Sequence, residues 1–329
     1  MTTPAFRRYT LTIGVAAALL AGCGGSQPVG APGAVPQTPA LATNADRGKS
    51  WMLPEAKKQP LIYMTATGSP LVSVFTFAGH LVGQLDVGSP QGECADNAGD
   101  VWIANTGASA MVEYAHGGKK PISTLEDPGQ QPVGCSVNTT TGDLAVANIC
   151  NAQSCGNGNL AIYPHASGPA KSYFDERIDH YYSCAYDGNG DLLVAGRSDK
   201  EKPADHKILF AELYKNGKTL ENVIMPPGFK PYQNVQGTKT YYAVEGFSNR
   251  ETFIYHIVFG GRHGKVLGRT QFSRRTSVES FFISGPQVVT LFVEGFVSFW
   301  HYPSGEFVDS FRITPRVQLP QFLVVSKPS

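Results

Sequence analysis

Charged residues are scarce in this sequence: Asp, Glu, Lys and Arg together make up 16% of its 329 residues. The two signs nearly balance. Residues 1–22 hold two of the 27 basic side chains and no acidic one, so the rest of the chain has 25 basic against 26 acidic side chains, a net charge of −1. A chain without excess positive charge is not steered to nucleic acid or to an anionic bilayer. We therefore expect no nucleic-acid partner.

Long helical and catalytic patterns are also missing. No segment repeats its apolar residues with the period of a helix, and no apolar run reaches the roughly twenty residues that span a bilayer. The sequence has no Walker loop, no His-Glu-x-x-His pair and no Ser-His-Asp order. Triads are defined by geometry and not by spacing, so this absence is weak evidence. On these patterns we name no catalytic residue, no cofactor and no metal.

The first 22 residues have the composition of a secretory signal. Arg7 and Arg8 precede an apolar run at 11–20, and small residues lead from this run to Cys23. The segment Leu20-Ala-Gly-Cys23 resembles the lipobox of bacterial lipoproteins at every position. The resemblance implies cleavage before Cys23 and attachment of lipid to its thiol, which anchors the chain to a membrane of the cell envelope. Gly24, in place of Asp, favours the outer membrane over the inner one.

A tether follows the lipidation site. Residues 24 to about 50 are rich in Gly, Pro, Ala, Gln and Thr and have almost no large apolar side chains. Such a segment buries too little surface to offset the entropy lost on ordering. We therefore divide the chain into a signal peptide at 1–22, a lipidated cysteine with a disordered tether at 23–57, and one folded domain at 58–329.

A unit recurs along the folded part. Gly-Asp pairs begin at Gly99, Gly142 and Gly190, which sets a period in the forties. Each pair stands between two runs of strand length that are alternating or wholly apolar, and looser copies follow at 234–257 and 278–305. A period of this length, with strands and tight turns, is typical of the four-stranded blades of a β-propeller.

The two ends of the chain complement each other. Residues 61–85 contain three strand-like runs without a first strand, and residues 320–326 supply one strand that starts with the same Pro-Gln pair as residue 90. Pairing these ends makes a sixth blade and leaves no exposed sheet edge between the first and last blades. The sequence thus predicts an all-β, six-bladed β-propeller with four antiparallel strands per blade, closed by its N- and C-terminal strands.

The repeat also resembles a known group of propellers. The pattern Pro-x-Gly-x-x-x-Asp, followed by Gly-Asp and an apolar run, is similar to NHL-type and gluconolactonase-like propellers over about residues 60–326. Uncharacterised bacterial propeller lipoproteins share the lipobox and tether. The gluconolactonase-like resemblance implies a divalent cation at the channel mouth, with an Asn five residues before the end of a first strand. The corresponding positions hold Gln91, Val133 and Tyr182, which are not the usual ligands of a hard cation. We therefore do not favour that activity.

Two other patterns have a simple structural interpretation. Asp187-Gly-Asn-Gly-Asp191 looks like the start of a calcium loop, but positions six and twelve hold Leu192 and Ser198 in place of Gly and Glu. We expect a turn between strands. His116 and His165 each follow a blade tyrosine by two residues, so we expect them in solvated turns of different blades.

Cysteines supply a further constraint. Five of the six remain when the lipobox cysteine is set aside, and outside the cytoplasm an even subset should be oxidised. Cys150 and Cys155 enclose a short Gly/Asn-rich loop, and we predict a disulfide between them. Cys94, Cys135 and Cys184 fall on the first strands of consecutive blades. Packing as small apolar residues is the favoured interpretation there, and a Cys94–Cys135 bridge is the alternative.

Loop lengths indicate a binding face. Loops between second and third strands emerge on the same face as loops between blades, and the longest lie at 148–159, 196–207 and 246–252. The candidate binding residues on this face are Tyr181, Tyr182, Arg197, Phe229, Tyr232, Glu245 and Arg250. Aromatic and arginine side chains often anchor partners, although such aromatics also pack loops down.

These features predict a monomeric, envelope-anchored binding scaffold with an unknown protein or small-molecule partner. The alternative is a propeller hydrolase or lyase, similar to the lactonases or the streptogramin lyases. A bound divalent ion, or His, Glu and Asp side chains converging at the channel mouth, would favour the enzyme.

Replacing Cys23 with alanine tests the lipid anchor. Cys23→Ala removes the thiol that takes the lipid, so we expect an unprocessed precursor that incorporates no labelled palmitate. Metabolic labelling and the mass of the N-terminal peptide measure both effects. A Cys23→Ala chain that is processed and retained in the membrane would contradict the assignment.

Overall fold

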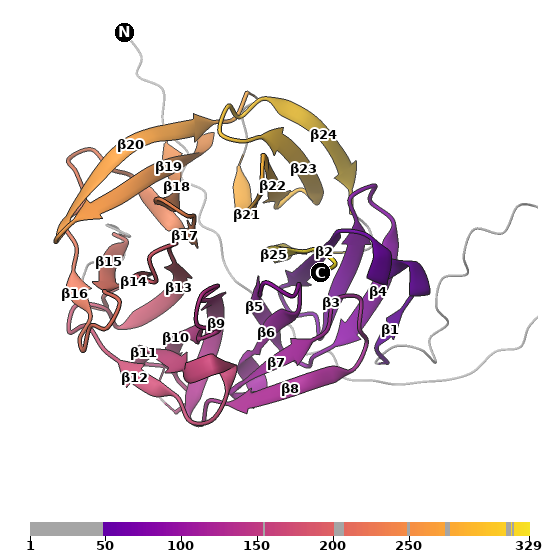
Figure 1. Cartoon of the computed structure of the whole chain (residues 1–329), viewed down its shortest axis with the longest axis horizontal. Coiled ribbons are helices and arrows are strands. Elements are labelled where there is room, and N and C mark those ends of the chain that lie inside the picture. The colour runs from indigo at the N-terminus through magenta and orange to yellow at the C-terminus, as the bar shows by residue number, and fades with distance from the viewer. Residues whose placement is uncertain are drawn as a thin grey trace, which may run out of the picture. The chain divides into compact units, whose positions relative to one another are not determined.

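Six antiparallel sheets surround a common axis in the structure, a computed structural model, and each sheet is one blade of a propeller (Figure 1). The structure describes residues 49–153, 155–200, 207–248, 251–273, 277–313, 317 and 319–329, which belong to the unit Asp46–Ser329. The expected signal peptide, Cys23 and most of the expected tether lie outside the described residues, as does Arg250. The predicted six-bladed β-propeller is confirmed.

Within a blade, the strands follow one another in sequence from the axis to the rim. Blades one to three consist of β5 (Pro90–Ala95), β6 (Val101–Asn105), β7 (Ala110–Tyr114) and β8 (Pro121–Glu126); β9 (Gln130–Val137), β10 (Leu144–Asn151), β11 (Asn157–Tyr163) and β12 (Lys171–Tyr173); and β13 (His180–Tyr186), β14 (Leu192–Arg197), β15 (Leu209–Leu213) and β16 (Glu221–Asn222). Blades four and five consist of β17 (Pro231–Gly237), β18 (Tyr242–Ser248), β19 (Glu251–Gly260) and β20 (His263–Gln271); and β21 (Val278–Ser284), β22 (Gln287–Phe292), β23 (Phe296–His301) and β24 (Phe307–Arg312). Second strands such as β22 are almost wholly buried, because neighbouring blades cover both of their faces.

The sixth blade is built from both ends of the described chain. β25 (Pro320–Ser326) takes the innermost position and pairs with β2 (Leu61–Ala66), which is followed outward by β3 (Leu71–Thr76) and β4 (Leu81–Asp86). In Figure 1 the yellow β25 lies beside the indigo β2, so the two ends close the ring as predicted. A polar contact supports this closure, since the Ser326 hydroxyl lies 2.6 Å from Nδ1 of His116 in blade one.

The folded part begins earlier than we expected. β1 (Trp51–Met52) pairs with the outer edge of β4, and a 3-10 turn, η1 (Pro54–Lys58), follows it. Ala56 in this turn is fully buried, and the indole nitrogen of Trp51 donates a hydrogen bond to Gln84 at 3.2 Å. Residues 51–57, which we assigned to the tether, therefore cover the outer edge of blade six.

Two more short 3-10 turns lie within the described residues, η2 (Thr106–Ala108) and η3 (Pro164–Ala166). In the part of the chain that the structure describes, no helix has the length and apolar character needed to cross a membrane.

The Gly-Asp pairs of the repeat form the turns after the first strands. Gly99, Gly142 and Gly190 have φ values of +84°, +75° and +90°, a left-handed conformation that glycine adopts without strain. In blade three, the carboxylate of Asp187 accepts the backbone N–H of Asp191 at 3.0 Å. This segment is the turn that we expected between β13 and β14.

Apolar side chains fill the spaces between neighbouring blades. Tyr63 of blade six packs with Ile103 of blade one in one cluster, and Trp102 of blade one packs with Tyr163 of blade two in the next. These large side chains are almost completely removed from water, which is the main favourable contribution to folding. Each blade is therefore stabilised by its two neighbours.

Two disulfides connect four of the five described cysteines. Cys94 of β5 bonds to Cys135 of β9, with the Cα atoms 5.6 Å apart. Our preference for simple packing at these two positions is wrong, because first strands converge near the axis and bring the two side chains within bonding distance. The predicted Cys150–Cys155 disulfide is confirmed, with a Cα–Cα distance of 4.5 Å. Cys184 is a buried free thiol.

Deleting residues 320–329 tests the ring closure. The deletion removes β25, including the buried Leu323, Val324 and Val325, and exposes the edge of β2. Burial of three such side chains stabilises a domain by roughly 5 kcal/mol, so we expect melting at least about 10 °C lower, or aggregation. Deletion of only the exposed residues 328–329 is the control. Equal melting temperatures for both deletions, measured by calorimetry, would show that the closure does not stabilise the ring.

Candidate functional site

The first strands of all six blades line a narrow cavity on the propeller axis. Its volume is about 250 Å³, and residues of β5, β9, β13, β17, β21 and β25 form its wall. A cavity of this size holds several water molecules but is small for an organic ligand, which typically needs roughly 300–1,000 Å³. Contacts with a ligand on the axis would therefore be made at an end of this channel.

Every first strand has an irregular pairing at the same end, the end from which the loops between second and third strands emerge. A β-bulge leaves a residue outside the hydrogen-bonded ladder and changes the direction of its side chain. We call the residues so released the mouth ring. They are Gln91 and Gly92, Val133, Tyr182, residues 232–234, Glu279 and Gln321.

The pattern of the sequence selected one residue at three of the six bulges, and Tyr232 at a fourth was among the predicted binding residues. Gln91, Val133 and Tyr182 are the positions that the cation pattern selected, and the structure places all three at bulges. Glu279 and Gln321 were missed because the fifth repeat copy has no Gly-Asp pair and because β25 is separated in sequence from its blade. The Pro-Gln pair at 320, which matches the pair at 90, is the signal that would have found Gln321.

A buried polar contact supports the bulge of β17. The side-chain amide of Asn234 donates hydrogen bonds to Glu245 Oε2 at 2.6 Å and to the backbone oxygen of Glu279 at 2.9 Å. Glu245 is 1% exposed. Burial raises the pKa of its carboxyl well above the ordinary value, and the bond from Asn234 acts in the opposite direction. Glu245, which we predicted on the binding face, is instead buried beneath it and bonds to Asn234, and the Asn234 amide connects blade four to blade five.

The same contact decides whether these residues suit the divalent cation that the gluconolactonase-like resemblance implies. The amide of Asn234 is turned toward Glu245, and burial favours the neutral form of that carboxyl. A hard cation needs several ionised or carbonyl oxygens directed at one point. This set does not fit the ion, and we assign no chemistry that depends on it.

Aromatic side chains dominate the mouth ring at blades three and four. Tyr232 and Phe247 are 41% and 42% exposed, and their ring centroids are 6.5 Å apart. Tyr182 lies nearby, since it is among the groups that raise the pKa of Tyr232, after burial and two carboxylates. Arg197 is exposed and close enough to lower the pKa of Tyr182, against a larger rise from burial. We call Tyr182, Arg197, Tyr232 and Phe247 the mouth cluster.

The other predicted residues have different positions. Tyr181 is fully buried, and its hydroxyl accepts the backbone N–H of Asp175 at 2.7 Å, so it stabilises the fold and does not reach the surface. Phe229 lies half-buried against Tyr255, with a centroid distance of 4.4 Å, and lines a second, larger hollow. Arg250 lies outside the described residues.

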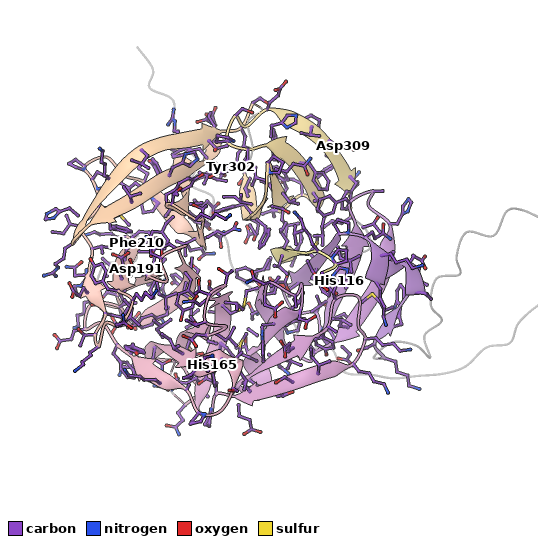
Figure 2. The ribbon with its side chains drawn as sticks, in the orientation of Figure 1. His116, His165, Asp191, Phe210, Tyr302 and Asp309 are labelled. Carbon is purple, nitrogen blue, oxygen red and sulfur yellow. A yellow bond between two sulfur atoms is a disulfide. The ribbon has the colours of Figure 1, made fainter. Side chains whose placement is uncertain are left out.

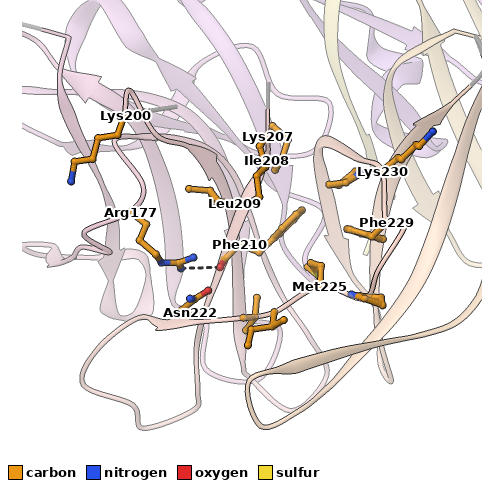
Figure 3. A pocket seen from close by; sticks show the side chains of 14 residues that line it. Arg177, Lys200, Lys207, Ile208, Leu209, Phe210, Asn222, Met225, Phe229 and Lys230 are labelled. Carbon is orange, nitrogen blue, oxygen red and sulfur yellow. Dashed lines mark hydrogen bonds between the residues drawn. The ribbon is translucent and has the colours of Figure 1, made fainter. Parts of the chain in front are cut away.

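This hollow is a groove at the side of blades three and four (Figure 3). The loop that connects β14 to β15 supplies Lys200 and Lys207, so the groove reaches the face on which the mouth cluster lies. Its volume is about 990 Å³. The floor is apolar and is formed by Phe210, Val223, Ile224, Met225 and Phe229, and the rim carries Arg177, Lys200, Lys207 and Lys230. The loop face of blades three and four thus has an aromatic cluster on the axis and a groove beside it.

Comparisons with known proteins show the fold alone. No family model and no curated protein matches this chain. Among solved structures, a protein of unknown function from Bacteroides caccae is 10% identical and has a TM-score of 0.59, with 82% of this chain and 99% of that chain covered. A functionally unknown protein from Desulfotomaculum acetoxidans DSM 771 is 15% identical, with a TM-score of 0.50 and coverage of 77% and 80%.

The opposite end of the propeller contains the two histidines that the sequence singled out, on separate blades (Figure 2). His165 is exposed, with Nδ1 2.8 Å from the backbone oxygen of Thr141, as we expected for a turn. His116 is half-buried and contacts Ser326 of β25, so it lies in a turn as we expected, but our expectation that this turn is solvated is wrong. Burial lowers its pKa. His116 is half-buried because the C-terminal strand β25 packs against it, and the sequence around residue 116 does not indicate this contact.

Three carboxylates also meet at this opposite end, those of Asp96, Asp100 and Glu113. Asp96 accepts the backbone N–H of Asp100 at 2.8 Å, and Asp100 accepts that of His116 at 3.0 Å. Burial, and then the neighbouring Asp100 and Asp96, raise the pKa of Glu113 to about 7. The two aspartates are engaged in turns, and we assign no ion to this cluster.

Glu93 of β5 is half-buried on the channel wall, and its two carboxylate oxygens are shielded from water. Neither of its carboxylate oxygens has a hydrogen-bond partner among the described residues, and burial raises its pKa well above the ordinary value. A carboxyl whose pKa is raised by folding contributes fully to the free energy of unfolding at pH values below its pKa in the unfolded state. That contribution is lost as the pH rises through the pKa of the folded state.

We therefore expect Glu93→Gln to melt several degrees higher than the wild type at about pH 8, and at nearly the same temperature at about pH 4, where both states are protonated. Thermal melts over this pH range measure the difference. Glu126→Gln, at an exposed position of β8, is the control and should change neither temperature. A Glu93→Gln chain with the wild-type pH dependence would show that Glu93 does not carry a buried charge.

Proposed function

We propose that this protein is an exported lipoprotein, held on the cell envelope by lipid on Cys23, whose β-propeller binds a protein or small-molecule partner at the mouth cluster. The observation that carries the binding role is the exposed Tyr232–Phe247 pair beside Tyr182. When a partner binds and buries large aromatic side chains that were exposed to water, the removal of their apolar surface from water contributes favourable free energy to binding.

The position of this cluster supports the proposal. Tyr182 and Tyr232 are released by bulges of rigid first strands, and Phe247 and Arg197 lie at the ends of the adjoining second strands. A site on rigid strands loses little conformational entropy when a partner binds. Tyrosine and arginine are also the side chains that most often dominate binding energy.

The chemistry of the chain supports export. The complete lipobox and the Gly/Pro-rich segment after it are typical of a lipidated protein on a tether. The two disulfides fit an oxidising compartment, where such bonds persist. The outer membrane is the favoured location because Gly24, and not Asp, follows Cys23.

The enzyme alternative has less support. A lactonase- or lyase-like propeller would direct ionised acids or histidines to one point at the channel mouth. At this mouth Glu245 is buried beneath the surface and bonded to Asn234. Assays of the purified protein with lactone and streptogramin substrates and added divalent cations test this alternative directly.

A photo-crosslinker at position 247 tests the binding role in cells that lipidate the full chain. Because Phe247 belongs to the mouth cluster, we expect benzoylphenylalanine at this position to form a defined adduct upon irradiation. Adding Tyr182→Ala and Tyr232→Ala should reduce the adduct at least about tenfold, the loss of roughly 1.4 kcal/mol or more that hot-spot tyrosines cause. The melting temperature should change little.

The control is the same crosslinker at Phe174, an exposed aromatic residue next to β12. It should give no such adduct. Equal adducts at both positions, or none at 247, would contradict binding at the mouth cluster. Unfolding of the double alanine variant would show instead that the tyrosines pack their own loops.

A further inference from the structure

His180 connects two blades and a loop beneath the mouth cluster. It is the first residue of β13, two positions before Tyr182, and it is 6% exposed. Its Nδ1 lies 2.9 Å from the backbone oxygen of Ile149 in blade two, and its Nε2 lies 2.7 Å from Oδ1 of Asp199. Asp199 belongs to the loop that begins after Arg197, so the imidazole joins this loop to blade two.

Both neighbours of the ring can only accept hydrogen bonds. A backbone oxygen and an ionised carboxylate have no proton to donate, so each bond needs a proton on the ring nitrogen that it uses. The neutral imidazole has one N–H group, and the imidazolium has two. Both contacts are therefore made only when His180 is charged, and a neutral ring directs a lone pair at Ile149 or at Asp199.

The contact with Asp199 belongs to a set of bonds that fix the start of the loop between β14 and β15. Asp179, the residue before His180, accepts the N–H of Asp199 at 2.7 Å and the hydroxyl of Ser198 at 3.0 Å. Ser198 in turn accepts the N–H of Lys200 at 3.1 Å. The side chain of Asp199 is 58% exposed and that of His180 is 7% exposed, so their ion pair ties a solvated loop to the interior of the fold.

The charged groups that the structure places around His180 belong mainly to blade three, and they are Asp179, Arg197, Asp199 and Lys200. The facing segment of blade two, residues 148–159, contains no acid or base, and its Asn148 donates to Asp127 at 2.7 Å. Residues 201–206 also contain charged side chains and lie outside the described residues. Histidine is the side chain that titrates between about pH 5 and 8, so His180 changes its charge beside Asp199 in that range.

We propose that His180 is a pH-sensitive latch for the loop after β14, and that the latch regulates binding at the mouth cluster. At acidic pH the imidazolium holds Ile149 and Asp199 together. As the pH rises, the ring loses one of its two donors, and the bond to Asp199 breaks because water can solvate this exposed carboxylate. The regulatory part rests on the proposed binding role, since a loop that is already fixed loses less conformational entropy when a partner binds beside it. Binding should therefore be stronger at acidic pH.

Hydrogen exchange at the backbone amides of Asp199 and Lys200 tests the latch without a partner. In the full-length protein we expect their protection, corrected for the intrinsic pH dependence of exchange, to fall at least about fivefold between about pH 5.5 and 8. Asp199→Asn keeps the shape of the side chain and removes its charge, so protection should change less than about twofold over this range. His180→Gln should have the same effect.

Two histidine variants are the controls. His165 lies in an exposed turn of blade two, and His206 belongs to the same loop as Asp199 but lies outside the described residues. His165→Gln and His206→Gln should both keep the wild-type pH dependence. Melting temperatures measured at acidic pH show whether each variant is folded, and Asp199→Asn, at an exposed position, decides the outcome if His180→Gln is not.

The crosslinker at position 247 tests the effect of the latch on the mouth cluster. Cells suspended at about pH 5.5 should give at least about threefold more adduct than cells at about pH 8. Adding Asp199→Asn should remove most of this difference. Because the partner is the same in both strains, a change in the pH dependence comes from the latch and not from the partner.

The two experiments separate the possible failures. Wild-type protection that does not depend on pH, or a pH dependence that survives Asp199→Asn or disappears in His206→Gln, would overturn the latch. A working latch with the same pH dependence of the adduct in wild type and Asp199→Asn would overturn its regulatory role. Absence of the adduct at every pH would contradict the proposed function, and the exchange measurement would still decide the latch.

Discussion

The pairing of β25 with β2 is the constraint on which the rest of the propeller depends. Each blade buries its faces against two neighbours, so a ring with one first strand missing exposes apolar surface and a row of unpaired backbone groups beside the axis. Specific contacts support this closure. Ser326 reaches His116, and glycine is required at position 99 because a Cβ there would collide with the carbonyl oxygen of Lys327. The Cys94–Cys135 disulfide then joins blade one to blade two.

The closed ring places six bulges at one end of the channel. A bulge increases the local twist of a strand and releases a side chain from the ladder. One to three residues at the same end of every first strand therefore produce a ring of side chains. The blades differ in which side chain they release. Amides on one side of the ring and tyrosines on the other give this end of the propeller an asymmetric surface.

The channel on the axis and the groove at blades three and four differ in the charged side chains near them. Near the axis, the carboxylates of Glu93 and Glu245 are shielded from water, and burial raises the pKa of each. At the side, lysines surround the apolar groove and no acid lines it in the described part of the chain. Buried acids reduce stability at neutral pH, whereas exposed lysines cost little until a ligand takes water from them. The two cavities therefore differ in the sign of the charged side chains that line them in the described part of the chain.

The sequence by itself determined the blades, their number and the closure, because strand periodicity, the Gly-Asp turns and the complementary ends are local patterns. It also identified the Cys150–Cys155 loop and the face with the long loops. Only the tertiary structure decided which side chains reach that face. It buried Tyr181 and Glu245, exposed Phe247, and brought Cys94 to Cys135 and His116 to Ser326. These outcomes depend on bulges and on contacts between blades, which join residues far apart in the chain and leave no periodic signal in either partner.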